Sequence, residues 1–229
     1  MESEMKTVVI TGSTRGIGLG LAREFLQRGH QVIVSGTSEQ SVANALKQLK
    51  GLGDMIGQPC RVEDYEAVQN LWNKGFERFG KIDIWINNAG ISTSKTILDE
   101  LALDEIHNTV DTNLIGSILC TKIAAKEMLK QGFGQIYMFE GFGSNGQLQK
   151  GITVYGSTKR ALRYFTAAAA NEYKDTPILI GSLSPGIVTT DLLIRASKDN
   201  GKSWERSKKI LNILADRVET VTPGWWSKH

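Results

Sequence analysis

Short β-branched runs alternate with longer amphipathic stretches from Thr7 to about Leu183. Parallel strands need long crossover connections, usually helices, so this alternation predicts a parallel sheet with helices on both faces. We therefore expect a doubly wound α/β fold in three αβα layers. The expected strands are Thr7–Ile10, Gln31–Ser35, Asp54–Cys60, Ile82–Asn87, Gly134–Phe139 and Ile178–Leu183. The expected helices lie near Ile17–Gln27, Gln40–Leu49, Asp64–Phe79, Glu100–Lys130, Val154–Tyr173 and Lys202–Val218.

The composition fits one domain. The chain has 229 residues, of which 41% are hydrophobic, and no stretch marks a linker, so we expect a single domain over residues 1–229 with one substantial core. The net charge is +3 and the basic residues form no block. We therefore expect neither nucleic acid nor an anionic membrane as a partner.

The first residues and the cysteines bear on the compartment. Met1 to Lys6 carries acidic residues and leads straight into a strand, and no later stretch reaches about 18 apolar residues. Cys60 and Cys120 lie far apart in apolar segments and belong to no C-x-x-C motif, so we expect buried reduced thiols and no metal site. These features predict a soluble, cytoplasmic protein.

A glycine-rich turn joins the first expected strand to the first expected helix, in the order that forms a dinucleotide site. Gly12 permits the tight turn, Gly16 lets backbone N–H groups approach a pyrophosphate, and Gly18 allows close packing of the helix. The glycine spacing differs from G-x-G-x-x-G, but its place after the first strand favours nucleotide binding over a simple turn. The residues expected at the pyrophosphate are Gly12, Ser13, Thr14, Arg15, Gly16, Ile17 and Gly18.

The end of the second strand bears on the choice between NAD and NADP, because an acidic residue there binds the adenosine ribose and repels a 2′-phosphate. Here the turn from Ser35 to Ser38 holds no carboxylate, and Glu39 is the first acid. Arg15, together with the hydroxyls of Thr37 and Ser38, suits an additional phosphate. We expect NADP(H), against the alternative of an exposed Arg15 and a Ser38 that caps a helix.

Tyr155 and Lys159 stand four positions apart, so on a helix their side chains share one face. A tyrosine has a pKa of about 10, and a cation one helical turn away favours its phenolate, which suits acid–base catalysis. A Tyr-x-x-x-Lys pair also arises by chance. Its meaning depends on the other motifs.

Further motifs follow in order: Asn87-Asn88-Ala89-Gly90 after the fourth strand, Asn113 in Asp-Thr-Asn-Leu, the Tyr155 and Lys159 pair, and Pro185-Gly186 before Val188 and Thr190. With the glycine turn, these motifs resemble the short-chain dehydrogenase/reductase family from about Lys6 to Leu193. The resemblance implies a Rossmann-type sheet and hydride transfer between a nicotinamide and a carbonyl or alcohol substrate.

The same resemblance assigns roles to individual residues. Tyr155 would be the general acid in reduction, Lys159 would bind the nicotinamide ribose and lower the tyrosine pKa, and Asn113 would hold a water in the proton relay. The remaining roles fall to Asn88, Ala89 and Gly90 on the adenosine and ribose side, and to Val188 and Thr190 at the carboxamide.

The chain departs from the family at its usual catalytic serine, about thirteen residues before the tyrosine. Gly141 or Phe142 falls at that place, and the nearest hydroxyl is Ser144. Ser144 is our candidate replacement, with Glu140 or a backbone N–H as alternatives, or a partly disabled site. The segment around Gly141 resembles the chlorophyll b reductase branch of the family, which implies a large ring carbonyl as substrate.

The third strand is followed by Cys60, Arg61 and Val62, where the family commonly has an aspartate in the position of Arg61. We expect both Arg61 and Val62 near the adenine. Arg61 can either stack on the base or point to solvent.

The chain also departs from the family after the sixth strand. No β-branched run remains to form the usual seventh strand, so we expect a six-stranded sheet and a substrate lid at residues 190–220. Trp204, in that segment, is expected in the core or against the substrate. The family builds one subunit contact from the seventh strand, so we expect a homodimer through the helices near Glu100–Lys130 and Val154–Tyr173.

Two hypotheses follow. The first is an NADP(H)-dependent oxidoreductase acting on a small-molecule carbonyl or alcohol. The second is a catalytically weak NADP-binding sensor or structural protein on the same fold. The presence of Asn113, Tyr155 and Lys159 favours the enzyme, because a binding module needs none of the three.

Overall fold

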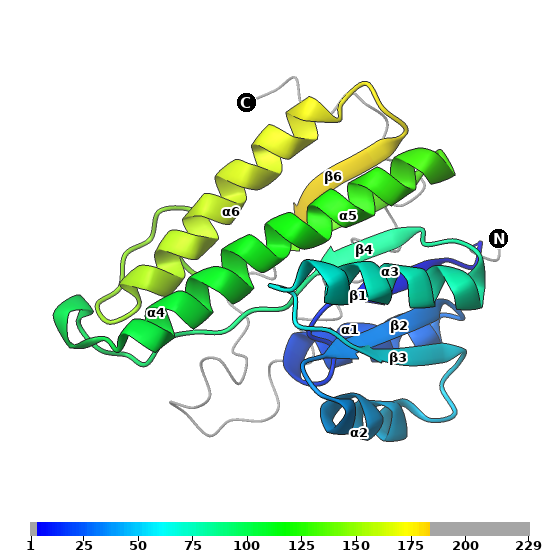
Figure 1. The fold of residues 1–229 in the computed structure, drawn as a ribbon, viewed down its shortest axis with the longest axis horizontal. Helices are drawn as coiled ribbons and strands as arrows, with labels where there is room; N and C mark the ends of the chain where they lie inside the picture. Colours follow the sequence, from blue (N-terminus) through cyan, green and yellow to red (C-terminus); the bar gives the residue numbers. More distant parts are fainter. Residues whose placement is uncertain (1–3, 184–229) are drawn as a thin grey trace.

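The computed structural model describes residues 4–183. A six-stranded parallel sheet, in the order β3-β2-β1-β4-β5-β6, forms the middle of the molecule (Figure 1). The strands are β1 (Thr7–Ile10), β2 (Gln31–Gly36), β3 (Met55–Pro59), β4 (Ile84–Asn87), β5 (Gly134–Phe139) and β6 (Ile178–Leu183). This confirms the predicted fold class. The question of a seventh strand concerns residues 184–229, which lie outside the described part.

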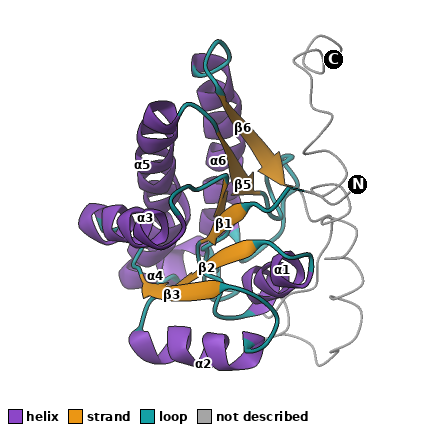
Figure 2. Cartoon of the chain, turned by 90° about the vertical axis from the view of Figure 1, so that its right-hand side faces the viewer, coloured by secondary structure: helices purple, strands orange, loops and turns teal. Residues whose placement is uncertain are grey.

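Helices cover both faces of this sheet (Figure 2). The main helices are α1 (Gly16–Gln27), α2 (Glu39–Leu49), α3 (Tyr65–Phe79), α4 (Leu103–Val110), α5 (Gly116–Gln131) and α6 (Thr153–Glu172). Two short elements accompany them, the 3₁₀ helix η1 (Leu98–Glu100) and the π-helical turn η2 (Asp111–Ile115). The expected helix at Lys202–Val218 falls outside the described residues.

Alternate residues of each strand feed two separate cores, because successive side chains point to opposite faces of a sheet. Val9 of β1 packs in the core that α3, α5 and α6 cover, whereas Val8 and Ile10 pack in the core that α1 and α2 cover. All three side chains are fully buried. This burial on both sides explains why the strands read as continuous β-branched runs.

The helix ends carry recognisable signals. Asp64 caps α3 by accepting hydrogen bonds from the backbone N–H groups of Glu66 and Ala67, at 2.9 and 3.1 Å. The same helix ends at Gly80, which adopts a left-handed conformation with φ of 75° that glycine tolerates without strain. These caps place the helix boundaries within one or two residues of those expected.

The helix predicted near Glu100–Lys130 is observed as one helical run, in which α4, η2 and α5 follow one another from Leu103 to Gln131. Leu101 is extended, which separates η1 from this run, and η2 is a π turn within it, since Val110 and Gly116 on either side keep right-handed helical dihedral angles. The turn forms where the Asn113 side chain bonds both backbone groups of Ile91. An inserted π turn of this kind is typical of functional sites.

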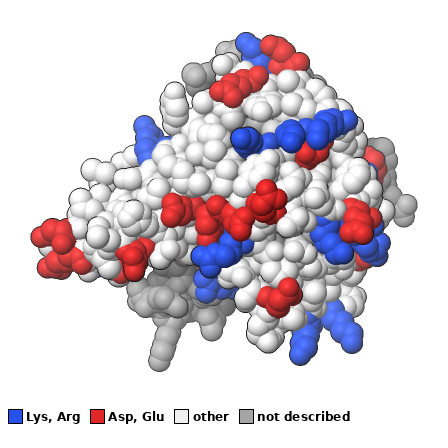
Figure 3. Space-filling view, viewed as in Figure 1, with Lys and Arg blue, Asp and Glu red and all other residues white. Residues whose placement is uncertain are grey.

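The face of the molecule in Figure 3 carries both basic and acidic side chains. Among residues 4–183, no helix has both the length and the apolarity needed to cross a membrane. Within the same residues, no group of His, Cys, Asp or Glu side chains is arranged to hold a metal ion. Cys60 and Cys120 are both free and buried, and burial raises the pKa of each thiol.

Candidate active site

The phosphate loop lies between the carboxyl end of β1 and the first turn of α1. Arg15 is the residue before the helix, and no side chain caps this terminus. The first N–H groups of a helix have no intrahelical partner, so those of Gly16 and its neighbours remain available to an anion. A Cβ added to Gly16 would meet no atom within 4 Å, which leaves room for a ligand directly against the backbone. The loop therefore fits the pyrophosphate of a dinucleotide.

The other two glycines of the loop are required by close packing. A Cβ added to Gly12 would lie 2.9 Å from Ala89 Cα, and one added to Gly18 would lie 2.5 Å from Asn88 Nδ2. Gly12 also has φ of 63°, a conformation that favours glycine. The predicted reasons for these glycines agree with the geometry.

Thr11, which the sequence analysis did not select, is a central support of this loop. Its Oγ1 accepts hydrogen bonds from the backbone N–H groups of Asn88 and Ala89, each at 3.0 Å. The Asn88 side chain returns two bonds, to the carbonyls of Thr11 and Gly12 at 2.9 and 3.1 Å. Thus Asn88 fixes the phosphate loop from the neighbouring strand β4. The position of Thr11, a hydroxyl residue directly before Gly12, could have marked it as part of the loop.

The turn after β2 brings together the residues expected near the adenosine. Arg15 and Thr37 are exposed. Ser38 caps α2, since its Oγ accepts from the backbone N–H of Ser41 at 3.2 Å. Ser13 is fully buried and bridges the first two strands, donating to the Ile10 carbonyl at 2.7 Å. Arg15 and Thr37 are therefore free to face a ligand, whereas the side chains of Ser13 and Ser38 are engaged in the fold.

Arg61 and Val62, which follow β3 and were both expected near the adenine, have different surroundings. Val62 is buried, and a Cβ on Gly116 would lie 2.5 Å from Val62 Cγ2, so this valine is a packing partner of α5. Arg61 is 65% exposed and pairs with Glu63 at 2.8 Å. Whether Arg61 stacks on the adenine of a bound cofactor stays a prediction.

The structure brings Asn113, Tyr155 and Lys159 together beside Gly90. A Cβ on Gly90 would lie 3.3 Å from Asn113 Oδ1 and 3.7 Å from Lys159 Nζ. Lys159 Nζ lies 5.8 Å from the centre of the Tyr155 ring. These side chains come from η2 and α6, which are separate in the sequence.

Hydrogen bonds hold two of these side chains in place. Asn113 Oδ1 accepts from the Ile91 N–H at 2.8 Å, and its Nδ2 donates to the Ile91 carbonyl at 2.9 Å and to Thr158 Oγ1 at 3.2 Å. Lys159 Nζ donates to the Phe139 carbonyl at 3.1 Å. Thr158, which the sequence analysis missed, therefore links Asn113 to α6. Thr158 stands between Tyr155 and Lys159 in the sequence, and this position could have marked it as a site residue.

Burial controls the charges of the pair. It raises the pKa of Tyr155 to about 12, and it lowers the pKa of Lys159 to about 8 against a weaker opposing effect of the nearby Glu140 carboxylate. Loss of water is the cause of the raised pKa of Tyr155, and the lowering of this pKa by Lys159 stays a prediction. At neutral pH the phenol is protonated and the lysine remains mostly charged.

Ser144 lies in the turn after β5. Its Oγ accepts from the Gly141 N–H at 3.0 Å and donates to the Gly141 carbonyl at 2.7 Å, and the side chain is buried. Gly141 itself lies against the phenol, since a Cβ there would come 2.5 Å from Tyr155 Oη. Val188, Thr190 and the lid at 190–220 lie outside the described residues.

A parallel sheet with a glycine-rich loop after its first strand, and a tyrosine–lysine pair at its carboxyl edge, defines a dinucleotide-dependent oxidoreductase of the Rossmann type. The chain matches the short chain dehydrogenase family over residues 6–201 and belongs to that family. This confirms the resemblance drawn from the sequence motifs.

The curated relatives include chlorophyll(ide) b reductases. The chain is 39% identical over 235 residues to "Probable chlorophyll(ide) b reductase NYC1, chloroplastic" of Arabidopsis thaliana, covering 94% of this chain and 46% of the relative. It is 36% identical over 221 residues to "Chlorophyll(ide) b reductase NOL, chloroplastic" of the same plant, covering 93% and 62%. The chain thus spans about half of the first relative and less than two thirds of the second.

Solved structures agree on the fold. A gluconate 5-dehydrogenase from Burkholderia cenocepacia, in complex with NADP and tartrate, superposes with a TM-score of 0.82 at 25% identity, covering 95% of this chain and 91% of that one. A short-chain type dehydrogenase/reductase from Mycobacterium marinum, at 24% identity and the same coverage, gives a TM-score of 0.85 and supports the fold alone.

One expectation is overturned by these relatives. The sequence was taken to indicate a cytoplasmic protein, but both chlorophyll(ide) b reductases, and their counterparts in Oryza sativa, are chloroplastic. The cytoplasmic prediction is therefore wrong. It rested on Met1 to Lys6, on the lack of a long apolar stretch and on the cysteines, and none of these features identifies a compartment by itself.

Proposed function

We propose that this short-chain dehydrogenase is an NADP(H)-dependent carbonyl reductase or alcohol dehydrogenase in which Tyr155 is the general acid and base. The observation that carries the proposal is the convergence of Tyr155, Lys159 and Asn113 at the carboxyl edge of the sheet, next to the phosphate loop. A module that only binds a dinucleotide has no use for this arrangement.

The chemistry follows from the charges. Bound NADPH would supply the hydride, and reduction of a carbonyl leaves negative charge on its oxygen. Tyr155 donates the proton to that oxygen, and the buried phenol, with its raised pKa of about 12, is protonated and ready to donate at neutral pH. Lys159 stabilises the phenolate that remains, since opposite charges attract strongly where water is excluded. Asn113 would hold the water that returns a proton to Tyr155.

NADP(H) is proposed over NAD(H) because no carboxylate follows β2 before Glu39, so no acidic side chain there would repel a 2′-phosphate. The related gluconate 5-dehydrogenase was solved with NADP. Titration of cofactor fluorescence should give a lower Kd for NADPH than for NADH. Arg15→Gln should weaken NADPH binding about tenfold and leave NADH binding within about twofold. Equal affinities in the unmodified protein would contradict the assignment.

The remaining cofactor contacts are proposed on the family pattern. Gly12, Gly16 and Ile17 would hold the pyrophosphate, Ala89 and Gly90 the ribose side, and Val188 and Thr190 the carboxamide. Residues 190–220 would close over the substrate. Thr190→Ala should raise the KM for NADPH with a smaller effect on the Kd of the adenosine fragment 2′,5′-ADP, because only the intact cofactor carries the carboxamide.

The substrate class is proposed to be a carbonyl on a large ring system, as in the chlorophyll(ide) b reductases that share 36–39% of their aligned residues with this chain. The test is NADPH oxidation with a panel that contains chlorophyllide b, a bulky aromatic ketone, a quinone and a small aliphatic ketone. Tyr155→Phe should abolish turnover while the Kd for NADPH stays within about twofold. Undiminished turnover in that variant would refute the role of Tyr155, and binding without turnover on any probe would favour a sensor.

A homodimer through α4, α5 and α6 is proposed because large apolar side chains lie exposed along these helices. Leu103 is 72% exposed and Tyr164 79%, and Ile115 and Leu129 lie between them in the sequence with exposures of 41% and 39%. Such apolar surface is typical of a subunit contact. Light scattering should give twice the mass of the chain, and Leu103→Glu with Tyr164→Glu should give the monomer. A stable tetramer would contradict the proposal.

A further inference from the structure

The turn from Gly141 to Ser144 is built tightly against the helix that carries Tyr155 and Lys159. A Cβ on Gly141 would lie 2.5 Å from Tyr155 Oη and 3.1 Å from Lys159 Cε. No larger residue fits there unless the phenol or the lysine moves. The backbone of Gly141 therefore packs directly against the phenol.

Ser144 fixes the position of the Gly141 backbone. Its hydroxyl bonds both backbone groups of Gly141, at 3.0 and 2.7 Å, and the Ser144 N–H donates to the Gly141 carbonyl at 3.1 Å. The side chain is 2% exposed. A hydroxyl has one proton to donate, and here that proton goes to the Gly141 carbonyl.

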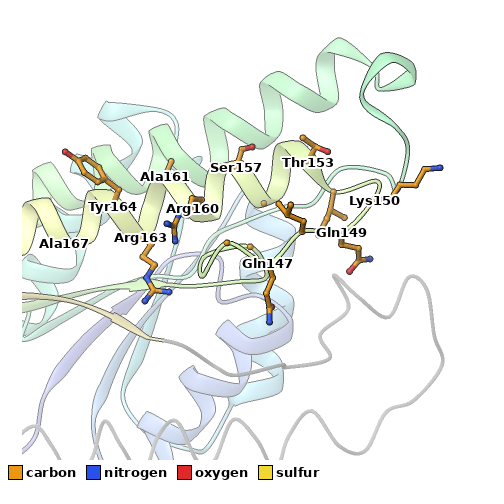
Figure 4. A pocket seen from close by; sticks show the side chains of 15 residues that line it. Gln147, Gln149, Lys150, Thr153, Ser157, Arg160, Ala161, Arg163, Tyr164 and Ala167 are labelled. Carbon is orange, nitrogen blue, oxygen red and sulfur yellow. The ribbon is translucent and has the colours of Figure 1, made fainter. Parts of the chain in front are cut away.

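Two further contacts fasten the turn to α6. Arg160 Nη1 donates to the Ser144 carbonyl at 3.0 Å. A Cβ on Gly143 would lie 2.8 Å from Gly156 Cα, so the backbones of the turn and the helix touch directly. Figure 4 shows Arg160 extending from α6 toward the loop that bears Gln147, beside the groove of about 1070 Å³ that these segments line.

We propose that Ser144 is a positioning residue, which acts through Gly141 to hold the Tyr155 phenol in place and out of water. This rests on the proposed function, in which Tyr155 transfers the proton. The backbone of Gly141 then occupies the position of the family's usual catalytic serine. Ser144, three residues later, holds that backbone in place through its hydrogen bonds. Ser144 has no proton left to donate to a substrate oxygen, because the one proton of its hydroxyl goes to the Gly141 carbonyl.

The test compares Ser144→Ala with Ser144→Thr, which keeps the hydroxyl. In Ser144→Ala the turn loses both side-chain bonds, so we expect kcat for NADPH-dependent reduction to fall about 30-fold while the Kd for NADPH stays within about twofold. Ser144→Thr should recover most of the loss. Gly141→Ala, which leaves Ser144 intact and crowds the phenol, should show the same split between kcat and Kd. The matched control is Ser94→Ala, which removes an exposed serine hydroxyl that donates to Glu105 at 3.0 Å.

A second readout needs no turnover. The Tyr155 phenol is titrated by NMR of ¹³C-labelled tyrosine between pH 9 and 11, and its resonance is assigned by its loss in Tyr155→Phe. In the unmodified protein the phenol should stay protonated throughout, because burial raises its pKa to about 12. In Ser144→Ala water reaches the phenol, and its titration should begin within this range.

The outcomes separate the two proposals. A phenol that titrates alike in Ser144→Ala and the unmodified protein overturns the positioning role, even where turnover falls, and leaves direct contact with the substrate as the explanation. An altered titration with no turnover on any probe supports the positioning role and refutes the proposed function. If Ser144→Ala does not fold, an unaltered titration in Gly141→Ala overturns the inference by itself.

Discussion

We expect the buried charge of Lys159 to lower the free energy of unfolding, so Lys159→Met should yield a more stable protein. The side chain is 6% exposed, and burial lowers its pKa from 10.5 to about 8. At about 1.4 kcal/mol for each unit of pKa, holding the charged lysine in the folded protein costs about 3 kcal/mol at pH 7. Methionine keeps the length of the stem and carries no charge.

The gain is partly offset. Lys159→Met loses the hydrogen bond to the Phe139 carbonyl, which is worth about 1 kcal/mol. The net gain expected at pH 7 is therefore about 2 kcal/mol. It should come with loss of turnover, as is common where a functional residue is buried against its preference.

The pH dependence has a definite sign. The pKa of Lys159 is lower in the folded protein than in the unfolded chain, so between about pH 8 and 10.5 the unfolded chain binds the proton that the folded protein has lost. The penalty is thus full below pH 8 and fades as the pH rises through this window. Between pH 7 and pH 9 the advantage of Lys159→Met should shrink by about 1 kcal/mol.

The assay is urea unfolding followed by tryptophan fluorescence at pH 7 and pH 9. Trp72 and Trp85 are stacked in the core with ring centres 6.0 Å apart, so their emission reports loss of the fold. The control is Lys126→Met on α5, where the side chain is 55% exposed and the same change should stay within about 0.5 kcal/mol. An unchanged midpoint for Lys159→Met at pH 7, or a gain that is as large at pH 9, would refute the reasoning.

Two further variants test the neighbouring contacts. Glu140→Gln removes the carboxylate that raises the pKa of Lys159, so the pH profile of kcat should lose activity at a lower pH than in the unmodified protein, and an unshifted profile would show that this carboxylate does not act on the lysine. Thr11→Val removes the acceptor of the Asn88 and Ala89 N–H groups, and we expect a loss of about 2 kcal/mol in urea unfolding together with weaker NADPH binding by cofactor fluorescence. Unchanged NADPH affinity in Thr11→Val would mean that Thr11 does not support the phosphate loop.

Much of the fold could be predicted from the sequence. The bounds expected for β1, β5 and β6 are those observed, because buried parallel strands are marked by runs of β-branched and apolar residues. The helix expected near Glu100–Lys130 is present from Leu103 to Gln131, but its π turn was not expected, because that turn lies at Asn113, whose side chain bonds Ile91, a residue far away in the sequence. Helical periodicity alone does not reveal such a contact.

The sequence by itself determined the phosphate loop and the tyrosine–lysine pair, since both depend on short-range spacing that any strand–turn–helix or single helix must reproduce. The tertiary structure decided the burial and the contacts of those groups. Burial raised the pKa of Tyr155, and packing of the turn after β5 placed Gly141 against the phenol and Ser144 against Gly141. Loss of water and close contact between distant segments are properties of the assembled fold, and local spacing does not encode them.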